Sequence, residues 1–304
     1  MADFSATDVA FSGIRFVRER PRTVAIWAGV QIVISLVLGG IVVATMGPYL
    51  AQMQDFSRQR SADPTQAMAV FSHLLPMYAL FLPLSLLINA VVYAAMARAV
   101  LRPADEGVGY LRFGGDEVRQ ILLMLLWIVV AIGAEIAGLI VVLIPTVILT
   151  LISKPLAALG ILFGLAVFAG LIYGLVRLSL SSAMTFDRKR VELFGSWTLT
   201  KGHFWNMLGA YALVIGLALV IIILVSIIST AVAAVLGGVG GMAAIFSGRV
   251  GSMADYFAPA RLAVTLLWAI VTPLFWALFL MPPAEIYRRL SGAADPALDP
   301  STFD

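Results

Sequence analysis

The chain has no cysteine, only two histidines, and no familiar catalytic motif. Without cysteine it can form no disulfide, no thiolate metal site and no cysteine nucleophile. The histidines, His73 and His203, fall on opposite sides of the membrane in the topology deduced below, so they cannot share a metal ion. A Gly-x-Ser-x-Gly elbow, a phosphate-binding glycine loop and a His-Glu-x-x-His pair are all missing. We therefore predict no catalytic, metal-binding or cofactor-binding residues and no enzymatic activity, with a membrane-embedded hydrolase of unfamiliar site as a minor alternative.

Charge is also scarce. Charged residues make up 12% of the chain and hydrophobic residues 61%, with a mean hydropathy of +1.00, whereas a soluble domain is about 25% charged. Apolar runs of about 20 residues recur, the length that crosses a bilayer as a helix. A membrane barrel would show segments of about ten residues that alternate between apolar and polar side chains. The sequence therefore predicts an all-α, polytopic membrane helix bundle.

Six apolar runs predict six transmembrane helices within a single transmembrane domain, residues 1–290. Their approximate bounds are 23–46, 74–101, 120–144, 156–178, 204–235 and 262–282. Residues 291–304 have little to bury, and we expect a disordered cytoplasmic tail there.

The basic residues predict the orientation. Because sides alternate from span to span, fifteen of the 20 Lys and Arg residues fall on the side of the N-terminus and five on the other side. This bias places both the N-terminus and the C-terminus in the cytoplasm. The formal net charge is +3, and we expect no nucleic-acid partner.

Three short amphipathic stretches, at 8–20, 108–119 and 191–205, precede the first, third and fifth spans on the side predicted to be cytoplasmic. Each predicts an elbow helix lying in the interface, with aromatic groups at headgroup depth and cations toward anionic lipid. The pattern of elbow, span and span recurs at a period of roughly 90 residues, which favours three two-helix repeats. Independent juxtamembrane segments are the alternative. The candidate lipid contacts are Arg15, Arg18, Trp197, Lys201, Phe204 and Trp205.

Glu135 lies near the middle of the third span, where a charged group costs about 3 kcal/mol on insertion scales. Ala131, Ala134 and Gly138 are its helical neighbours, and small residues favour close packing of helices. We therefore expect Glu135 to point into the bundle. It would serve there as a proton, cation or substrate site, or as a hydrogen-bonded packing residue.

Other polar residues of the spans are weaker candidates for the same intramembrane site. Ser85 and Asn89 are one turn apart in the second span and are expected to bond across helices. The fourth span contains two Gly-x-x-x-Gly pairs, the second of which ends at Gly174. Arg177 follows three residues later. An Arg177–Glu135 pair would have to bridge two or three turns, and we do not expect it.

One stretch carries a resemblance. It comprises Arg-Leu-Ser-Leu at 177–180, Phe-Gly-Ser-Trp-Thr-Leu-Thr-Lys-Gly-His-Phe-Trp at 194–205, and Leu-Gly at 208–209. It is similar to bacterial multi-span proteins of unknown function related to the membrane domain of glycerophosphoryl diester phosphodiesterases. The resemblance implies a multi-span helical fold and a bacterial inner membrane. Hydrolysis in such enzymes belongs to an attached soluble domain, so the activity is not expected to transfer.

Two functional hypotheses follow. The first is a non-enzymatic membrane protein that acts through lipids, mainly anionic ones, or through membrane-protein partners that include further copies of itself. The second is a small transporter or channel that uses Glu135. An accessory subunit of a larger membrane complex is a third, minor hypothesis.

Overall fold

The structure, a computed structural model, describes residues 4–58, 64–248 and 250–292. Every regular element in this part of the chain is a helix. The short elements are α1 (Ala6–Ala10), α2 (Ser12–Glu19), η1 (Lys154–Leu159), α7 (Ser181–Arg188), α8 (Gly195–Leu199) and α10 (Met253–Tyr256). The long helices are α3 (Pro21–Arg58), α4 (Pro64–Leu101), α5 (Gly115–Ile152), α6 (Gly160–Leu178), α9 (Phe204–Ser247) and α11 (Pro259–Ser291).

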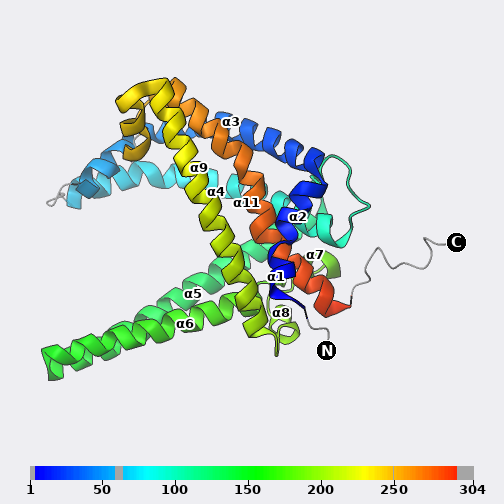
Figure 1. Ribbon diagram of the computed structural model, residues 1–304. Helices are drawn as coiled ribbons and strands as arrows, with labels where there is room; N and C mark the ends of the chain where they lie inside the picture. The colour runs from blue at the N-terminus through cyan, green and yellow to red at the C-terminus, as the bar shows by residue number, and fades with distance from the viewer. Residues whose placement is uncertain (1–3, 59–63, 249, 293–304) are drawn as a thin grey trace.

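The expected class is confirmed: six helical segments among the described residues are long and apolar enough to cross a membrane. They form three hairpins, α3–α4, α5–α6 and α9–α11, whose partners pack against each other. In Figure 1 the α5–α6 hairpin runs well apart from the α3–α4 hairpin, and the two come together only near one end of the molecule. Whether the hairpins are sequence repeats stays a prediction.

We call that end the base: α1, α2, residues 102–114, α7, α8 and the last turns of α11. All the segments that the sequence places on the side of the N-terminus lie there, as the alternating topology requires. They are joined by the pairs Asp8–Arg289, Arg20–Glu106, Asp116–Lys189 and Asp187–Tyr287.

The helices are longer than the predicted spans, because an apolar run marks only the part of a helix that needs hydrocarbon around it. α5 continues through Pro145 to Ile152, and α3 continues through Pro48. The first half of the loop expected between residues 235 and 262 is instead the end of α9, which bends at Gly238, where φ is 57° and ψ is −149°. The expected tail at 291–304 lies outside the described residues except for Ser291 and Gly292.

The first expected elbow is present as α1 and α2, but it packs against α11 as well as facing outward. A Cβ atom built on Gly13 of α2 would lie 2.4 Å from the carbonyl oxygen of Ala277 in α11. Since that carbonyl is backbone, this closeness requires glycine. The N-terminal elbow is therefore part of the helix packing of the base.

The second expected elbow is not a helix. Residues 102–114 form turns that fold over α3 and α4, and residues 115–119 are the first turn of α5. The Trp27 indole donates to the carbonyl of Gly109 over 2.7 Å, and Tyr110 is fully buried with φ at 61°. Gly114 and Gly115 interrupt the amphipathic pattern, and side-chain bonds to the loop backbone replace helical ones.

The third expected elbow contains a helix of only five residues, α8, from Gly195 to Leu199. Gly202, with φ at 89°, turns the chain into α9, as expected of a glycine in a left-handed conformation. Phe204 and Trp205 therefore belong to the first turn of α9 rather than to the elbow.

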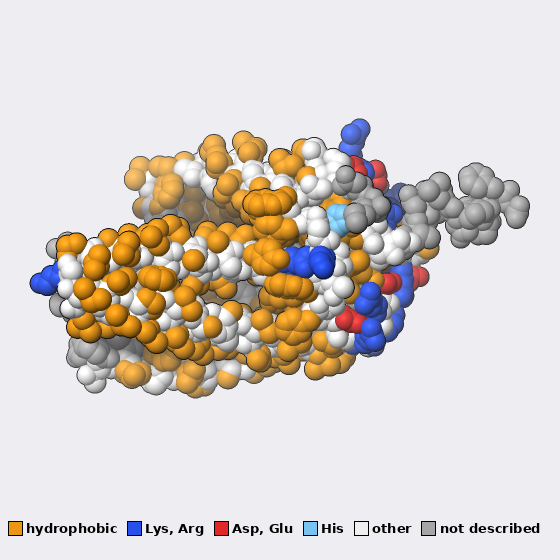
Figure 2. Space-filling view, turned by 90° about the horizontal axis from the view of Figure 1, so that it is seen from below, with side chains coloured by type: hydrophobic (Ala, Val, Ile, Leu, Met, Phe, Trp, Pro, Cys, Tyr) orange, Lys and Arg blue, Asp and Glu red, His pale blue; other side chains and the backbone are white. Residues whose placement is uncertain are grey.

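Figure 2 shows the surface that results: most of it is hydrophobic, and most charged side chains on this face gather at one end. On α5 the exposed fraction is 65% at Val129 and reaches 82% at Leu151. Apolar surface of this extent is unstable in water and suits contact with lipid or with other helices.

Candidate functional site

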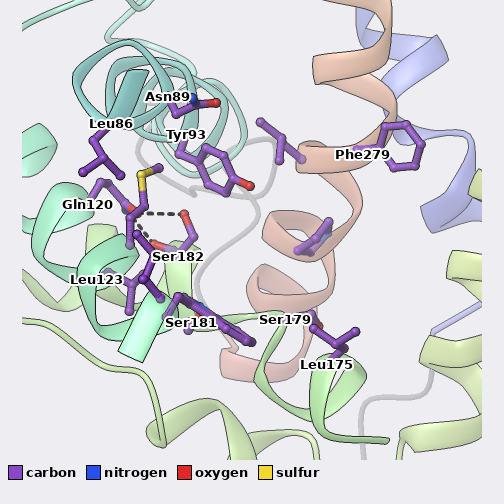
Figure 3. A pocket seen from close by; sticks show the side chains of 15 residues that line it. Leu86, Asn89, Tyr93, Gln120, Leu123, Leu175, Ser179, Ser181, Ser182 and Phe279 are labelled. Atoms are coloured by element: carbon purple, nitrogen blue, oxygen red, sulfur yellow. Dashed lines mark hydrogen bonds between the residues drawn. The ribbon is translucent and has the colours of Figure 1, made fainter. Parts of the chain in front are cut away.

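The strongest candidate site is a pocket between α4, α5, α11 and the turn that joins α6 to α7 (Figure 3). Its volume is about 530 Å³, within the range of about 300–1,000 Å³ that is typical of small-molecule sites. We call it the central pocket. Its lining residues are Leu86, Asn89, Tyr93, Gln120, Leu123, Met124, Trp127, Ile128, Leu175, Ser179, Ser181, Ser182, Phe279, Leu280 and Pro283.

Several polar side chains of the central pocket are engaged in holding its walls. Gln120 of α5 is bonded twice to Ser182 of α7, with Nε2 donating to the carbonyl over 2.9 Å and Oε1 accepting from Oγ over 3.0 Å. The Trp127 indole donates to Ser181 Oγ over 3.1 Å. These bonds fix α5 against the start of α7, so the pocket is preformed.

Two other polar groups of the central pocket remain available. Among the described residues the hydroxyl group of Tyr93 has no hydrogen-bond partner, and in Figure 3 the ring points into the pocket. The Asn89 amide donates from Nδ2 to the carbonyl of Ser85 over 2.8 Å, which leaves its Oδ1 oxygen as an acceptor. Together they offer one hydroxyl donor and one amide acceptor on neighbouring turns of α4.

No Lys, Arg, Asp or Glu is among the described residues that line the central pocket. The rest of the lining is apolar, and Ile128, Leu175 and Phe279 are also exposed on the hydrophobic outer surface, at 38%, 58% and 44%. The pocket therefore opens laterally toward the bilayer. It is suited to an amphipathic guest with an uncharged polar group and an apolar body.

Glu135 corrects one prediction. It does not point into the bundle: its side chain is exposed on α5, and no described residue forms a hydrogen bond or ion pair with it. It does not line the central pocket either. Of the small neighbours, Gly138 packs against Val167 of α6. The hairpin lies apart from the other spans, and Glu135 itself has no partner among residues 4–58, 64–248 and 250–292.

Ser85 and Asn89 also differ from expectation. Neither bonds across helices: Ser85 Oγ donates to the carbonyl of Leu82 over 2.8 Å, and Asn89 donates to the carbonyl of Ser85. Both bonds stay within α4, because serine and asparagine side chains reach the carbonyls of the preceding turn. Asn89 lines the central pocket and Ser85 does not.

Arg177 is buried, and its role lies at the base. Its guanidinium donates to the carbonyl of Trp197 over 2.5 Å and lies 5.0 Å from the centre of the Trp197 ring. The ring of Tyr173 lies 5.8 Å away on the same α6 helix. Arg177 therefore ties α8 to the end of α6, and Nε of Arg177 is buried without a partner among the described residues.

The interfacial candidates divide into two groups. Arg18, Lys201 and Trp205 are exposed, with Trp205 at 77%, and neither cation has an ion-pair partner in the described chain. Phe204 packs against Tyr173, with ring centroids 4.9 Å apart, and Arg15 forms an ion pair of 2.5 Å with Asp8. Phe204 and Arg15 thus contribute to the packing of the base.

Sequence reasoning missed Tyr93 and Gln120. A tyrosine in an apolar run looks like a core residue, and Gln120 stands at the edge of its span, where a polar residue needs no explanation. One signal was the cluster Ser179, Ser181 and Ser182 at the end of a span, which has more hydroxyl groups than a helix end requires.

No protein-family model, curated protein or solved structure that was compared with this chain matches it. The likeness of residues 177–209 to the phosphodiesterase membrane domain therefore stays a prediction. The function proposed next rests on the residues of this chain.

Proposed function

We propose that this protein is a non-enzymatic membrane protein that binds one lipid-like amphiphile in the central pocket, with its uncharged polar group beside Tyr93 and Asn89. The observation that carries the proposal is the unpartnered Tyr93 hydroxyl in a pocket of about 530 Å³ that opens onto the apolar surface. A hydroxyl group that faces an apolar pocket without a hydrogen bond is unfavourable in a membrane, and a ligand oxygen would supply the missing bond.

The chemistry of the lining selects the class of ligand. A phosphate group is held by several donors or by Arg and Lys, and the described lining provides no cation. An ester carbonyl or a hydroxyl group needs one donor and one acceptor, which Tyr93 and Asn89 supply. A diacylglycerol, a monoacylglycerol or a long-chain alcohol fits this pattern, and a phospholipid headgroup does not.

The base supplies a second, less specific contact with the bilayer. Arg18, Lys201 and Trp205 are exposed beside apolar surface, as in residues that anchor proteins at the headgroup level. With the base in the cytoplasm of a bacterium, these residues would face the anionic leaflet of the inner membrane. The central pocket would then draw its ligand from that leaflet.

The test uses a diacylglycerol with a photoreactive acyl chain, added to the purified protein in nanodiscs of zwitterionic lipid. Tyr93→Phe removes a single hydroxyl group, and Leu86→Trp fills part of the pocket. Ser85→Ala is the matched control, because it alters a hydroxyl one turn from Asn89 but outside the pocket.

We expect labelling to fall about five- to tenfold with Tyr93→Phe, the effect of losing about 1–1.4 kcal/mol. Leu86→Trp should lower it further, and Ser85→Ala should leave it unchanged. Equal labelling of the wild type and of Leu86→Trp would refute lipid binding in the central pocket. Competition by phosphatidylglycerol as strong as that by unlabelled diacylglycerol would refute the choice of an uncharged head.

A further inference from the structure

Glu135 is a polar group at membrane depth that no residue in the described part of the chain satisfies. It lies eight residues beyond Trp127, whose indole is bonded at the start of α7, and 18 residues before Ser153, where α5 has ended. At 1.5 Å per residue these separations are about 12 Å and about 27 Å along the helix. The carboxyl group is therefore well inside the apolar part of α5.

Lipid cannot satisfy this group. Acyl chains carry no polar atoms at that depth, and an acidic residue at the middle of a span costs about 3 kcal/mol on insertion scales. Acidic side chains within spans accordingly face protein or water. The face of α5 that carries Glu135 thus requires a polar partner.

The described residues of this chain do not supply that partner. The neighbouring residues of the same helical face, Ile132 and Leu139, are 53% and 54% exposed. α5 contacts α4 and α7 toward the base and otherwise packs along α6 and η1 (Figure 1). Arg177, the cation on the neighbouring helix α6, donates to the carbonyl of Trp197 at the base instead.

We propose that the α5 face of Ile132, Glu135 and Leu139 binds the same face of a second copy of this chain. Two copies inserted with the same topology and related by a twofold axis along the membrane normal place equivalent residues at equal depth. Glu135 then meets Glu135. A carboxylic acid in its neutral form carries both a donor and an acceptor, so the group is complementary to itself.

Space on the hairpin allows close approach. A Cβ atom built on Gly170 or Gly174 of α6 would meet no atom within 4 Å. Small residues let helix backbones approach each other, which strengthens the van der Waals contacts and the interhelical hydrogen bonds that join helices in lipid. The glycines suit the hairpin to helix packing, and the unsatisfied carboxyl group is the reason for placing a second copy on the face of Glu135.

The absence of native cysteine makes the geometry directly testable. Ile132→Cys and Leu139→Cys are introduced singly, and native membranes are treated with copper phenanthroline. Val141→Cys is the matched control, because Val141 is 47% exposed on the same helix but lies 200° around from Leu139 at about 3.6 residues per turn.

We expect disulfide-linked dimers from Ile132→Cys and Leu139→Cys and monomer from Val141→Cys. Dimers at all three positions in equal yield would indicate random collision and would overturn the proposal. So would monomer at all three.

The role of the carboxyl group is tested by single-molecule photobleaching of the labelled protein at increasing dilution in lipid bilayers. Glu135→Leu should raise the dissociation constant about five- to tenfold, the equivalent of about 1–1.4 kcal/mol. Glu135→Gln keeps a donor and an acceptor and should dimerise nearly as the wild type does. A wild type that stays monomeric in bilayers, with Cys variants that cross-link only to other proteins in native membranes, would overturn the second copy as the occupant.

Discussion

Arg98 of α4 and Glu117 of α5 form an ion pair of 2.8 Å at the base, with 4% and 1% of their side chains exposed. The same guanidinium donates to the carbonyl of Tyr110 over 2.5 Å and lies 5.4 Å from the centre of the Phe186 ring of α7. Arg98 therefore joins two spans, the loop at 102–114 and α7. In the described part of the chain, Arg98 is the one cation that pairs with the buried Glu117.

Removing Arg98 should be among the most damaging changes to the base. Arg98→Ala leaves Glu117 buried and unpaired, which typically costs about 3–5 kcal/mol. The free energy of unfolding, measured by SDS titration in mixed micelles, should fall by that amount. Arg18→Ala, at an exposed site, should change it by less than about 0.5 kcal/mol. A loss below about 1 kcal/mol for Arg98→Ala would show that water reaches Glu117.

Gly13 should be intolerant of a single methyl group. Gly13→Ala places a Cβ atom against the Ala277 carbonyl and forces α2 away from α11, at a cost of about 1–3 kcal/mol. The control is Gly29→Ala in α3, where a Cβ atom meets nothing within 4 Å. That change should be neutral or stabilising by about 0.5–1 kcal/mol. Equal effects of the two changes in thermal unfolding would contradict this packing.

The Asp8 carboxylate should link the stability of the base to pH. Hydrogen bonds from Arg15 and then from Arg289 lower the pKa of Asp8 from its ordinary 3.8. The contribution of Asp8 to stability is therefore present above that ordinary value and lost as pH falls through the lower pKa of the folded state. Between about pH 5 and about pH 3, the wild type should lose more thermal stability than Asp8→Asn, which has no such group to protonate. Parallel losses would show that the Asp8 pair adds nothing.

The two tryptophans beside the third elbow should behave differently. Trp197→Ala uncovers the buried Arg177 and should lower stability in detergent by about 1–3 kcal/mol. Trp205 is 77% exposed, so replacing it should change the stability in detergent by no more than about 0.5 kcal/mol. In lipid bilayers, lipids brominated near the headgroup should quench the fluorescence of Trp205. Trp205→Phe should therefore reduce the quenchable part of the tryptophan fluorescence. Quenching equal to that of the wild type would place Trp205 away from the interface.

The orientation can be tested with the same cysteine-free background. Ser247→Cys lies at the end of α9 away from the base, and Ser291→Cys ends α11 at the base. In intact cells, an impermeant maleimide should label the first and not the second. The reverse result would show that the orientation in the membrane is the opposite of the predicted one.

The class, the number of long helices and the gathering of the base segments were predictable, since hydrophobic length and alternation of sides are local properties. The predicted helix ends near Pro48 and Pro145 came too early, because an apolar run does not show how far a helix continues. The chain from Arg102 to Gly114 could not be predicted, since its form depends on Trp27 and Arg98, which approach it only after α3 and α4 have packed.

The candidate site was predictable only in part. Asn89 stood out as polar within a span, whereas Tyr93 and Gln120 gained their meaning from the meeting of α4, α5 and α7. For Glu135 the neighbouring small residues predicted a packed position, whereas the side chain is exposed. The pattern could not show this, because periodicity carries no information on which helix is opposite.

The divergence of the α5–α6 hairpin from α4 has a mechanical consequence. The two arms meet near the base and diverge beyond it, so in a bilayer the space between their far ends would be filled by lipid chains or by another helix. Membrane thickness and lateral pressure would then act on the angle between the two hairpins. The Arg98–Glu117 pair and the central pocket both lie near the point where the hairpins meet. A thinner bilayer, or one under higher lateral pressure, would change this angle and with it the opening of the central pocket.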